Sequence, residues 1–368
     1  MARRRAAIAD VMEREGTGHL LVYSAGRATA GQWLTGWPVT AESVVLLSAA
    51  APDILFVQLR NHVPNAREIA APLEVRWGGA STMSTAIDEL RARGASGPVG
   101  VIGPLPFQDH RILGSALGSV VDLSASYGRL RRIKSDEELE WVRRGVELTD
   151  RSIRALRLGL SPGLTEHHLA DLVERAYVPD GGTTHIHFFV ATPMADPERC
   201  VPAQWPSART LRPGDALVTE LSAAFWGYPG QILQTFTVAA DPTPLYRELH
   251  DVAEAALDAI LGVLRAGATP REVIEAASVI EDSGFTTYDD LVHGFVGGYL
   301  DPVLGSRSRA LREVPEEPFE AGMTVVVQPN VITQDERAGV QVGELVLITP
   351  TGVERLHRSE RGLLRVGE

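Results

Sequence analysis

Two histidines separated by one residue have a spacing suited to chemistry. His185 and His187 lie in the run Thr-His-Ile-His-Phe at 184–188. If this run is a β-strand, both imidazoles project from one face, because side chains along a strand alternate with a period of two. Imidazoles exchange protons near neutral pH, so the pair predicts a general acid or base. With one carboxylate, two histidines can instead hold a metal ion, and both interpretations stay open at this point.

The composition is that of an ordinary folded protein and argues against several classes of partner. The chain has 368 residues, of which 44% are hydrophobic and 22% charged, enough to bury a sizeable core. Its formal net charge of -12 repels phosphate backbones and anionic lipid. No apolar run approaches the roughly 18 residues of a membrane span. We therefore expect neither nucleic acid nor a membrane as a partner.

Cysteine usage and the N-terminal segment suggest where the protein works. The single Cys200 excludes an internal disulfide and a multi-cysteine zinc site. Arg3, Arg4 and Arg5 precede a mixed polar helix instead of an apolar segment, so we expect no signal peptide. Both observations fit a location in the reducing cytoplasm.

Residues 1–130 alternate short β-rich runs with helical ones. A helical stretch at 85–93 lies among β-rich runs at 20–23, 43–47, 53–57 and 99–102. This alternation predicts a small α/β domain.

Residues 131–368 are expected to form a second, α+β domain. Ser135 followed by three acidic residues is typical of the start of a long helix, and a second helix is expected from Thr165 to Tyr177. Further strands are expected at 188–192, 216–219, 236–239, 323–327 and 340–348, and further helices at 246–266 and 270–283. Helices grouped against antiparallel strands differ from the strict alternation of a doubly wound sheet.

Several segments, in order along the chain, resemble the creatinase/prolidase/aminopeptidase P superfamily. They are the runs at 33–37, 133–139 and 211–215, Gly227-Tyr228 with Thr235-Phe236, His293-Gly294, Gly322-Met323 with Pro329, and Thr349 with Gly352. Each motif alone is weak, but together they span nearly the whole chain. The resemblance implies a creatinase-type α/β N-terminal domain followed by a catalytic domain with the pita-bread fold.

Peptidases of this superfamily bind two divalent ions through two Asp, one His and two Glu. The resemblance places these positions at Glu220, Gln231, His293, Gln328 and Gly343, with Glu344 next to the last. Glu220 and His293 alone keep a suitable donor, which sets about one negative charge against the roughly four positive charges of two ions. We therefore expect no metal and no other cofactor.

The family's substrate-handling positions are replaced as well. A histidine that the metal-free creatinases use as acid or base corresponds to Ala203, a second family histidine to Leu300, and an arginine of the last strand to Gln341. The chain therefore resembles neither an ordinary peptidase nor an ordinary creatinase at these positions. The loss at Ala203 gives the pair His185 and His187 a possible role, because either could supply the missing base.

The residues that remain predict a polar pocket. Candidate catalytic residues are His293, Glu220, His187 and His185, and candidate substrate-binding residues are Gln231, Gln328, Gln341, Tyr228 and Glu344. Glu220 and His293 are the inherited pair able to exchange protons. The alternatives are structural: Glu220 bonds a strand end, His293 fills a turn, the glutamines are satisfied buried groups and Tyr228 packs.

Our first functional hypothesis is a metal-independent enzyme acting on a small polar, nitrogen-containing molecule. The simplest reaction is hydrolysis of a C–N bond, as in creatinase-like members, and a lyase, cyclase or isomerase step of a biosynthetic pathway is the alternative. A catalytically inactive binding module is a second hypothesis. A metal-dependent Xaa-Pro-type peptidase is a third, against which the ligand count argues. The resemblance also implies a homodimer.

Overall fold

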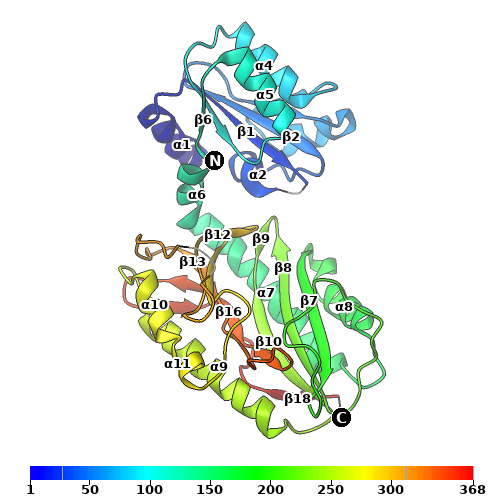
Figure 1. The fold of residues 1–368 in the computed structure, drawn as a ribbon. Coiled ribbons are helices and arrows are strands. Elements are labelled where there is room, and N and C mark those ends of the chain that lie inside the picture. The colour runs from blue at the N-terminus through cyan, green and yellow to red at the C-terminus, as the bar shows by residue number, and fades with distance from the viewer. Residues whose placement is uncertain (27, 311–312, 368) are drawn as a thin grey trace. The chain divides into compact units, whose positions relative to one another are not determined.

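The computed structural model describes residues 1–26, 28–310 and 313–367. Its contacts divide the chain into two compact units, Met1–Arg131 and Arg132–Glu368. Figure 1 colours the chain from blue in the first unit to red at the end of the second. Among the described residues, no helix combines the length and apolar character needed to cross a membrane.

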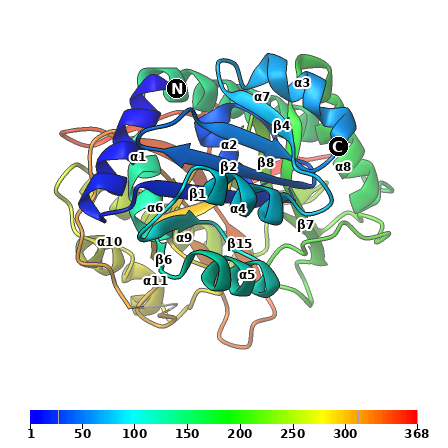
Figure 2. The same ribbon diagram turned by 90° about the horizontal axis from the view of Figure 1, so that it is seen from above.

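The described part of the first unit is a six-stranded mixed sheet between two layers of helices. The strand order is β4 (Glu74–Trp77), β3 (Ile54–Val57), β2 (Glu42–Ser48), β1 (His19–Ala25), β5 (Val99–Ile102) and β6 (Val120–Asp122). One face packs against α1 (Ala2–Arg14), α2 (Thr29–Thr35), α3 (Val63–Ile69) and α6 (Ser124–Arg132), with the short η1 (Arg60–His62) before α3. The other face packs against α4 (Thr82–Ala92) and α5 (Phe107–Leu117) (Figure 2). Because both faces are covered, the middle of each central strand is buried and mainly apolar, at residues 20–23 of β1 and 44–47 of β2.

The described residues of the second unit form a ten-stranded sheet and a separate strand pair. The main order is β12 (Tyr299–Leu304), β11 (Val292–Phe295), β13 (Thr324–Val327), β16 (Gly343–Ile348), β10 (Ile232–Val238), β8 (Asp215–Phe225) and β7 (Thr183–Pro193). The short strands β17 (Val353–Arg355), β18 (Leu364–Val366) and β9 (Tyr228–Pro229) pair with β16, β10 and β8, and β14 (Asn330–Ile332) pairs with β15 (Gly339–Gln341). The neighbours along the main order are antiparallel.

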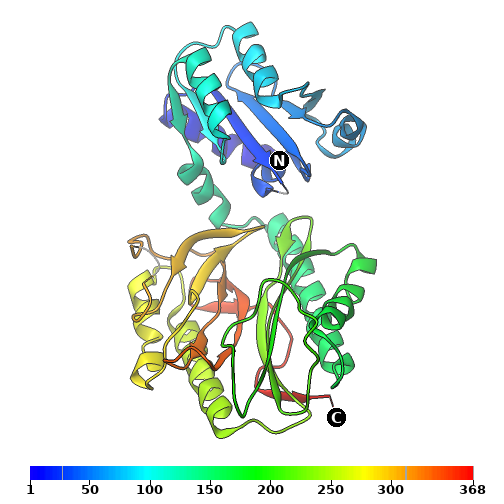
Figure 3. The same ribbon diagram turned by 45° about the vertical axis from the view of Figure 1, so that its right-hand side comes forward.

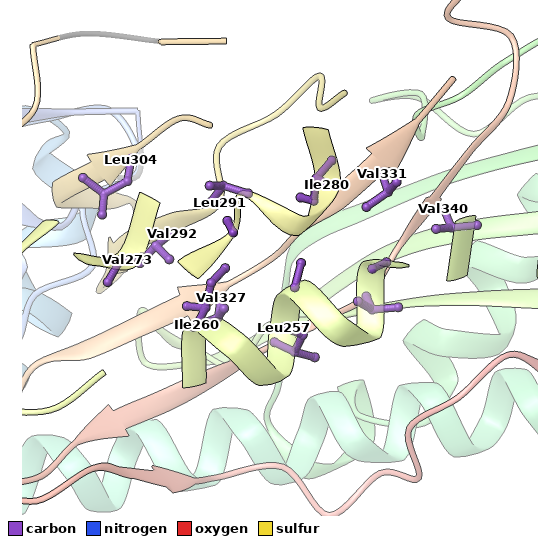
Figure 4. Close-up of a cluster of buried hydrophobic side chains, with 14 of the residues drawn as sticks. Leu257, Ile260, Val273, Ile280, Leu291, Val292, Leu304, Val327, Val331 and Val340 are labelled. Carbon is purple, nitrogen blue, oxygen red and sulfur yellow. The ribbon is translucent and has the colours of Figure 1, made fainter. Parts of the chain in front are cut away.

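Two groups of helices cover the two halves of this sheet (Figure 3). Helices α7 (Asp136–Gly159) and α8 (Glu166–Arg175), followed by η2 (Val178–Asp180), pack on β7, β8 and β10. Helices α9 (Pro244–Val263), α10 (Pro270–Ala276) and α11 (Val279–Asp282) pack on β11, β13 and β16. Figure 4 shows this second core, where Leu257 and Ile260 of α9 lie close to Val327 of β13. The predicted α+β class is confirmed.

Capping residues define the start of the long helix that the sequence predicts after Ser135. Ser135 accepts a hydrogen bond from the Glu138 amide while the Glu138 carboxylate accepts from the Ser135 amide, which closes a capping box at the start of α7.

Two predicted elements are each divided in the structure. The helix expected at 270–283 is α10 followed by α11, and the strand expected at 340–348 is β15 followed by β16, with Val342 between them.

Candidate active site

A chain of hydrogen bonds joins buried polar side chains across the large sheet of the second unit. The Gln231 amide nitrogen Nε2 donates to Glu220 Oε1 at 2.8 Å and to Gln328 Oε1 at 3.2 Å. Gln328 Nε2 in turn donates to Asp290 Oδ1 at 3.1 Å. Glu220 lies on β8, Gln231 precedes β10, Gln328 follows β13 and Asp290 precedes β11. The Gln231–Gln328 bond therefore spans β16, which lies between β10 and β13.

His293 lies on β11, buried and held between aromatic rings. Its ring stacks on Tyr299 with centroids 4.0 Å apart and meets the edge of Phe295 at 5.2 Å. Nδ1 lies 3.1 Å from the carbonyl oxygen of Gly294, which can only accept, so Nδ1 carries the hydrogen. Nε2 then holds a lone pair, and no hydrogen-bond partner for it occurs within the described residues. Burial lowers the pKa of His293 to about 4, against smaller opposing effects of the hydrogen bond to the Gly294 carbonyl and of the Gln328 side chain.

Carboxyl groups gather around Glu220. Burial, followed by the charges of Asp289 and Asp290, raises the pKa of Glu220 to about 8. Burial also raises the pKa of Asp289. The pKa of Tyr299 is raised by burial and then by the charges of Asp290, Asp289 and Glu220, so its hydroxyl lies near all three. At neutral pH Glu220 is therefore protonated and His293 is uncharged.

The expectation that His185 and His187 project from one face is wrong, because β7 has an irregularity between Thr184 and Ile186. In the pairing of β7 with β8, Thr184 lies opposite Ala223 and Ile186 opposite Ser222, so His185 has no opposite residue. The ring centroids of His185 and Phe295 lie 5.4 Å apart, which places His185 in the site region. His187 faces α8 and η2 instead. Its Nε2 is 3.0 Å from the Tyr177 hydroxyl, and burial lowers the pKa of His187 to about 4.

Two other predicted substrate-binding residues do not join the hydrogen-bond chain. The Tyr228 hydroxyl donates to Glu138 of α7 at 3.2 Å and its ring packs on Trp141 at 5.4 Å, which matches the packing alternative. Glu344 accepts a hydrogen bond from Arg355 Nε at 2.6 Å. It neighbours Gly343 on β16, and side chains alternate along a strand, so Glu344 projects from the opposite face of the sheet.

Gln341 lies at the end of β15, next to β10. Its backbone amide donates to Thr235 Oγ1 at 3.0 Å, and Thr235 Oγ1 donates to its carbonyl oxygen at 3.0 Å. Its side-chain oxygen Oε1 is buried, and the described residues offer it no hydrogen-bond donor. Gln341 therefore stays a candidate for binding a polar ligand.

The site contains three residues that sequence reasoning missed: Asp289, Asp290 and Tyr299. The available signal was their position, since the two aspartates lie two and three residues before the start of β11 and Tyr299 starts β12. They could be found only by placing β11 and β12 side by side.

The donor groups present do not fit a two-metal centre. In the chain of hydrogen bonds, Gln231 Nε2 donates to Glu220 Oε1 and Gln328 Nε2 donates to Asp290 Oδ1. Both carboxylate oxygens are therefore occupied by amide hydrogens and not free to coordinate a metal ion. The described residues contain no group of three or more His, Cys, Asp or Glu side chains arranged to hold a metal ion. At Gly343, an added Cβ would lie 2.3 Å from the carbonyl oxygen of Val327 and 2.7 Å from Gln328 Cα. A glutamate side chain at this position requires β13 to move.

Glu220 is expected to make the protein less stable as pH rises from about 6.5 to 8. The unfolded carboxyl ionises near 4.5, whereas its folded pKa is about 8. Between these values the folded state binds more protons, so the free energy of unfolding falls by about 1.4 kcal/mol per pH unit, or about 2 kcal/mol over the interval. His293, whose pKa is lowered, contributes below this range.

The variant Glu220→Gln keeps the shape of the side chain and removes the titration. Urea denaturation of wild type and variant at pH 6.5 and pH 8 measures the difference. We expect the stability of the variant to fall by about 2 kcal/mol less than that of wild type over this interval. Parallel curves for the two proteins would contradict a raised pKa at Glu220.

Comparison with known proteins gives consistent family and fold matches. Residues 140–350 match the sequence model of metallopeptidase family M24. An uncharacterised peptidase of Staphylococcus saprophyticus is 26% identical over 268 residues, covering 70% of this chain and 72% of that protein. A Xaa-Pro dipeptidase of Pyrococcus furiosus is 25% identical over 236 residues, covering 64% of this chain and 66% of that protein.

Solved structures resemble the whole chain in fold. The prolidase from Pyrococcus horikoshii superposes with a TM-score of 0.83 at 19% identity, covering 98% of this chain and 99% of that chain. The dipeptidase PepE from Mycobacterium ulcerans superposes with a TM-score of 0.83 at 22% identity, covering 100% of this chain and 98% of that chain.

Proposed function

The chain belongs to metallopeptidase family M24, and on that premise we propose that it is a hydrolase that works without the two-metal centre. The observation that carries the proposal is the pair of proton-exchanging groups in the hydrogen-bonded site. Glu220 has a pKa of about 8 and His293 a pKa of about 4. Between these values Glu220 holds a proton and His293 Nε2 holds a lone pair, the states that a general acid and a general base require.

The reaction that fits this pair is hydrolysis of a C–N bond in a small, polar, nitrogen-containing substrate. His293 Nε2 accepts a proton from water as the water oxygen bonds to the substrate carbon. Glu220 donates its proton to the nitrogen as the C–N bond breaks. The Gly294 carbonyl keeps the hydrogen of His293 on Nδ1, so that Nε2 is the free base. An elimination, cyclisation or isomerisation would use the same two groups and differ in its products.

The test is a screen of amides, amidines and guanidines in the presence of EDTA, with products identified by mass spectrometry. We expect turnover that survives chelation. Water labelled with oxygen-18 places the label in the product if the reaction is hydrolysis, and an unlabelled product would indicate the lyase, cyclase or isomerase alternative. Turnover that EDTA abolishes and added metal restores would contradict the proposal.

A metal-dependent Xaa-Pro dipeptidase is the second candidate. It is favoured by the names of the relatives, among them the Xaa-Pro dipeptidase of Pyrococcus furiosus, although the sequence reasoning above ranked this activity last. The donor set at Glu220, Gln231 and Gln328 argues against it, because the two glutamines bring no negative charge.

Metal content separates the two candidates. We expect less than about 0.1 metal ion per protomer by inductively coupled plasma mass spectrometry, since fewer than three ionisable ligands converge. We also expect no hydrolysis of Ala-Pro after addition of Mn²⁺, Co²⁺ or Zn²⁺. One or two bound ions together with Ala-Pro cleavage would replace our proposal by the second candidate.

A further inference from the structure

The proposed general base is sealed from solvent. His293 is fully buried, as are Gln231 and Gln328 of the same site. A base that takes a proton from water must meet both water and substrate at its free nitrogen. The structure therefore shows a closed site, and the proposed reaction needs a residue that moves aside to open it.

The ring of Tyr299 covers one face of the His293 imidazole. The two ring centroids lie 4.0 Å apart and the ring planes are 20° from parallel. Phe295 also contacts His293, with its ring edge-on at 5.2 Å, but it is 2% exposed. Tyr299 is 52% exposed. Of these two aromatic neighbours of His293, Tyr299 is therefore the one that reaches from the buried base to solvent.

Tyr299 also lies in a part of the sheet that few bonds hold. It begins β12, the first strand in the main order of the described sheet, which pairs with β11 on one side. The turn between β11 and β12 contains Gly297 and Gly298 at φ 59° and 144°, values that glycine adopts without strain. An added Cβ at Gly298 would meet nothing within 4 Å, so open space adjoins the turn. Segments with few contacts open more readily than the centre of a sheet.

We propose that Tyr299 is a gate, whose ring closes the site by stacking on His293 and admits substrate to the base when it rotates toward solvent. The inference rests on the proposed function, because it assigns an entrance to that site. Rotamer changes of exposed side chains are far faster than typical turnover, so the gate selects which molecules reach His293 without limiting kcat. The space that the ring leaves against the imidazole is flat, which suits the planar C–N groups of amides, amidines and guanidines.

Chemical modification of His293 tests the gate without any turnover. Diethylpyrocarbonate acylates the nitrogen of a neutral imidazole, the state of His293 at pH 7. The full chain is treated with the reagent, and mass spectrometry of its peptides gives the rate at each histidine. His110 of α5 is exposed and serves as the reference in the same sample. We expect wild-type His293 to react at least about 10-fold more slowly than His110, because the site is open for a small fraction of the time.

Variants of Tyr299 assign the closure to its ring. Tyr299→Ala removes the ring, and we expect His293 to be modified at least about 10-fold faster than in wild type. Tyr299→Phe keeps the stacked ring and should stay within about 3-fold of wild type. Tyr288→Ala is the matched control, because Tyr288 is 45% exposed and its ring contact is with Arg309. If Tyr299→Ala does not fold, Tyr299→Leu replaces it and should show a smaller rise in the same direction.

A buried histidine of the same unit separates opening of the gate from general loosening. The side chain of His357 is fully buried and lies 2.7 Å from Asp150 of α7. Its modification rate should be the same in wild type and in every Tyr299 variant. Three results would overturn the gate: an unchanged rate at His293 in Tyr299→Ala, a rise at His357 that parallels the rise at His293, or wild-type His293 that reacts as fast as His110.

The two proposals fail separately. Turnover of an amide, amidine or guanidine with an unchanged modification rate in Tyr299→Ala would overturn the gate and leave the metal-free hydrolase standing. Faster modification in Tyr299→Ala without turnover of any of these compounds would support the gate and count against the hydrolase. It would then favour the hypothesis of a binding module.

Discussion

Replacing His293 by glutamine is expected to lower kcat of the metal-free reaction by about 10²- to 10⁴-fold, the usual contribution of a positioned general base. Glutamine keeps a hydrogen-bonding side chain against the Tyr299 ring but cannot accept a proton near neutral pH. KM should change much less than kcat, because glutamine keeps the polar character of the position and leaves Gln231 and Gln328 in place. The measurement is steady-state kinetics on the best substrate of the amide, amidine and guanidine screen.

The pH profile of kcat/KM tests whether the loss of activity in His293→Gln comes from a role of His293 in proton transfer. For wild type we expect kcat/KM to fall below about pH 4, where His293 becomes protonated, and above about pH 8, where Glu220 loses its proton. His293→Gln should remove the acid limb and Glu220→Gln the alkaline limb, each at a much lower rate. His167→Gln changes an exposed histidine of α8 and is the matched control. If kcat/KM fell comparably in His187→Gln and was retained in His293→Gln, the general base would be His187, on the other side of β7.

Gly343→Ala is expected to destabilise the second unit by about 2–4 kcal/mol, in the range of severe overpacking. The new Cβ would lie 2.3 Å from the Val327 carbonyl oxygen and 2.7 Å from Gln328 Cα, and backbone atoms cannot move aside as a side-chain end can. The measurement is the midpoint of urea denaturation with an unchanged slope.

Gly262→Ala is the matched control for this prediction. Gly262 lies in α9 of the same unit, where an added Cβ meets nothing within 4 Å. Alanine is favoured over glycine in a helix by about 0.5–1 kcal/mol, so this variant should be slightly more stable than wild type. Stability of Gly343→Ala equal to wild type would mean that β13 and β16 leave room for a glutamate, and would reopen the case for a metal centre.

Local signals explain why much of the fold was predictable. The caps at Ser135 and Thr165 fix the starts of α7 and α8 through bonds to residues three positions on. The division of one predicted helix into α10 and α11 and of one predicted strand into β15 and β16 has no comparable sequence signal. Apolar residues continue through both breaks, because the chain packs on the same core on either side.

The candidate site was predictable in its inherited residues and not in its new ones. Glu220 and His293 lie on strands and Gln231 and Gln328 directly at strand ends, at positions that the family resemblance could align. The irregularity in β7 that separates His185 from His187 is invisible to a period-two argument, because one extra residue reverses the face of each side chain that follows. Asp289 and Asp290 enter the site through the pairing of distant strands, which no local pattern records.

The amide bridge of Gln231 and Gln328 has a consequence for how protons move. Carboxyl groups in direct contact share one proton and titrate as a pair. Here two amides stand between Glu220 and Asp290, and every hydrogen bond between them has an amide N–H as its donor. An amide does not release or relay a proton at ordinary pH, so the bridge transmits polarisation and insulates against proton conduction. Glu220 can therefore keep its proton for the substrate, because the amide bridge offers no proton path to the Asp290 carboxyl group.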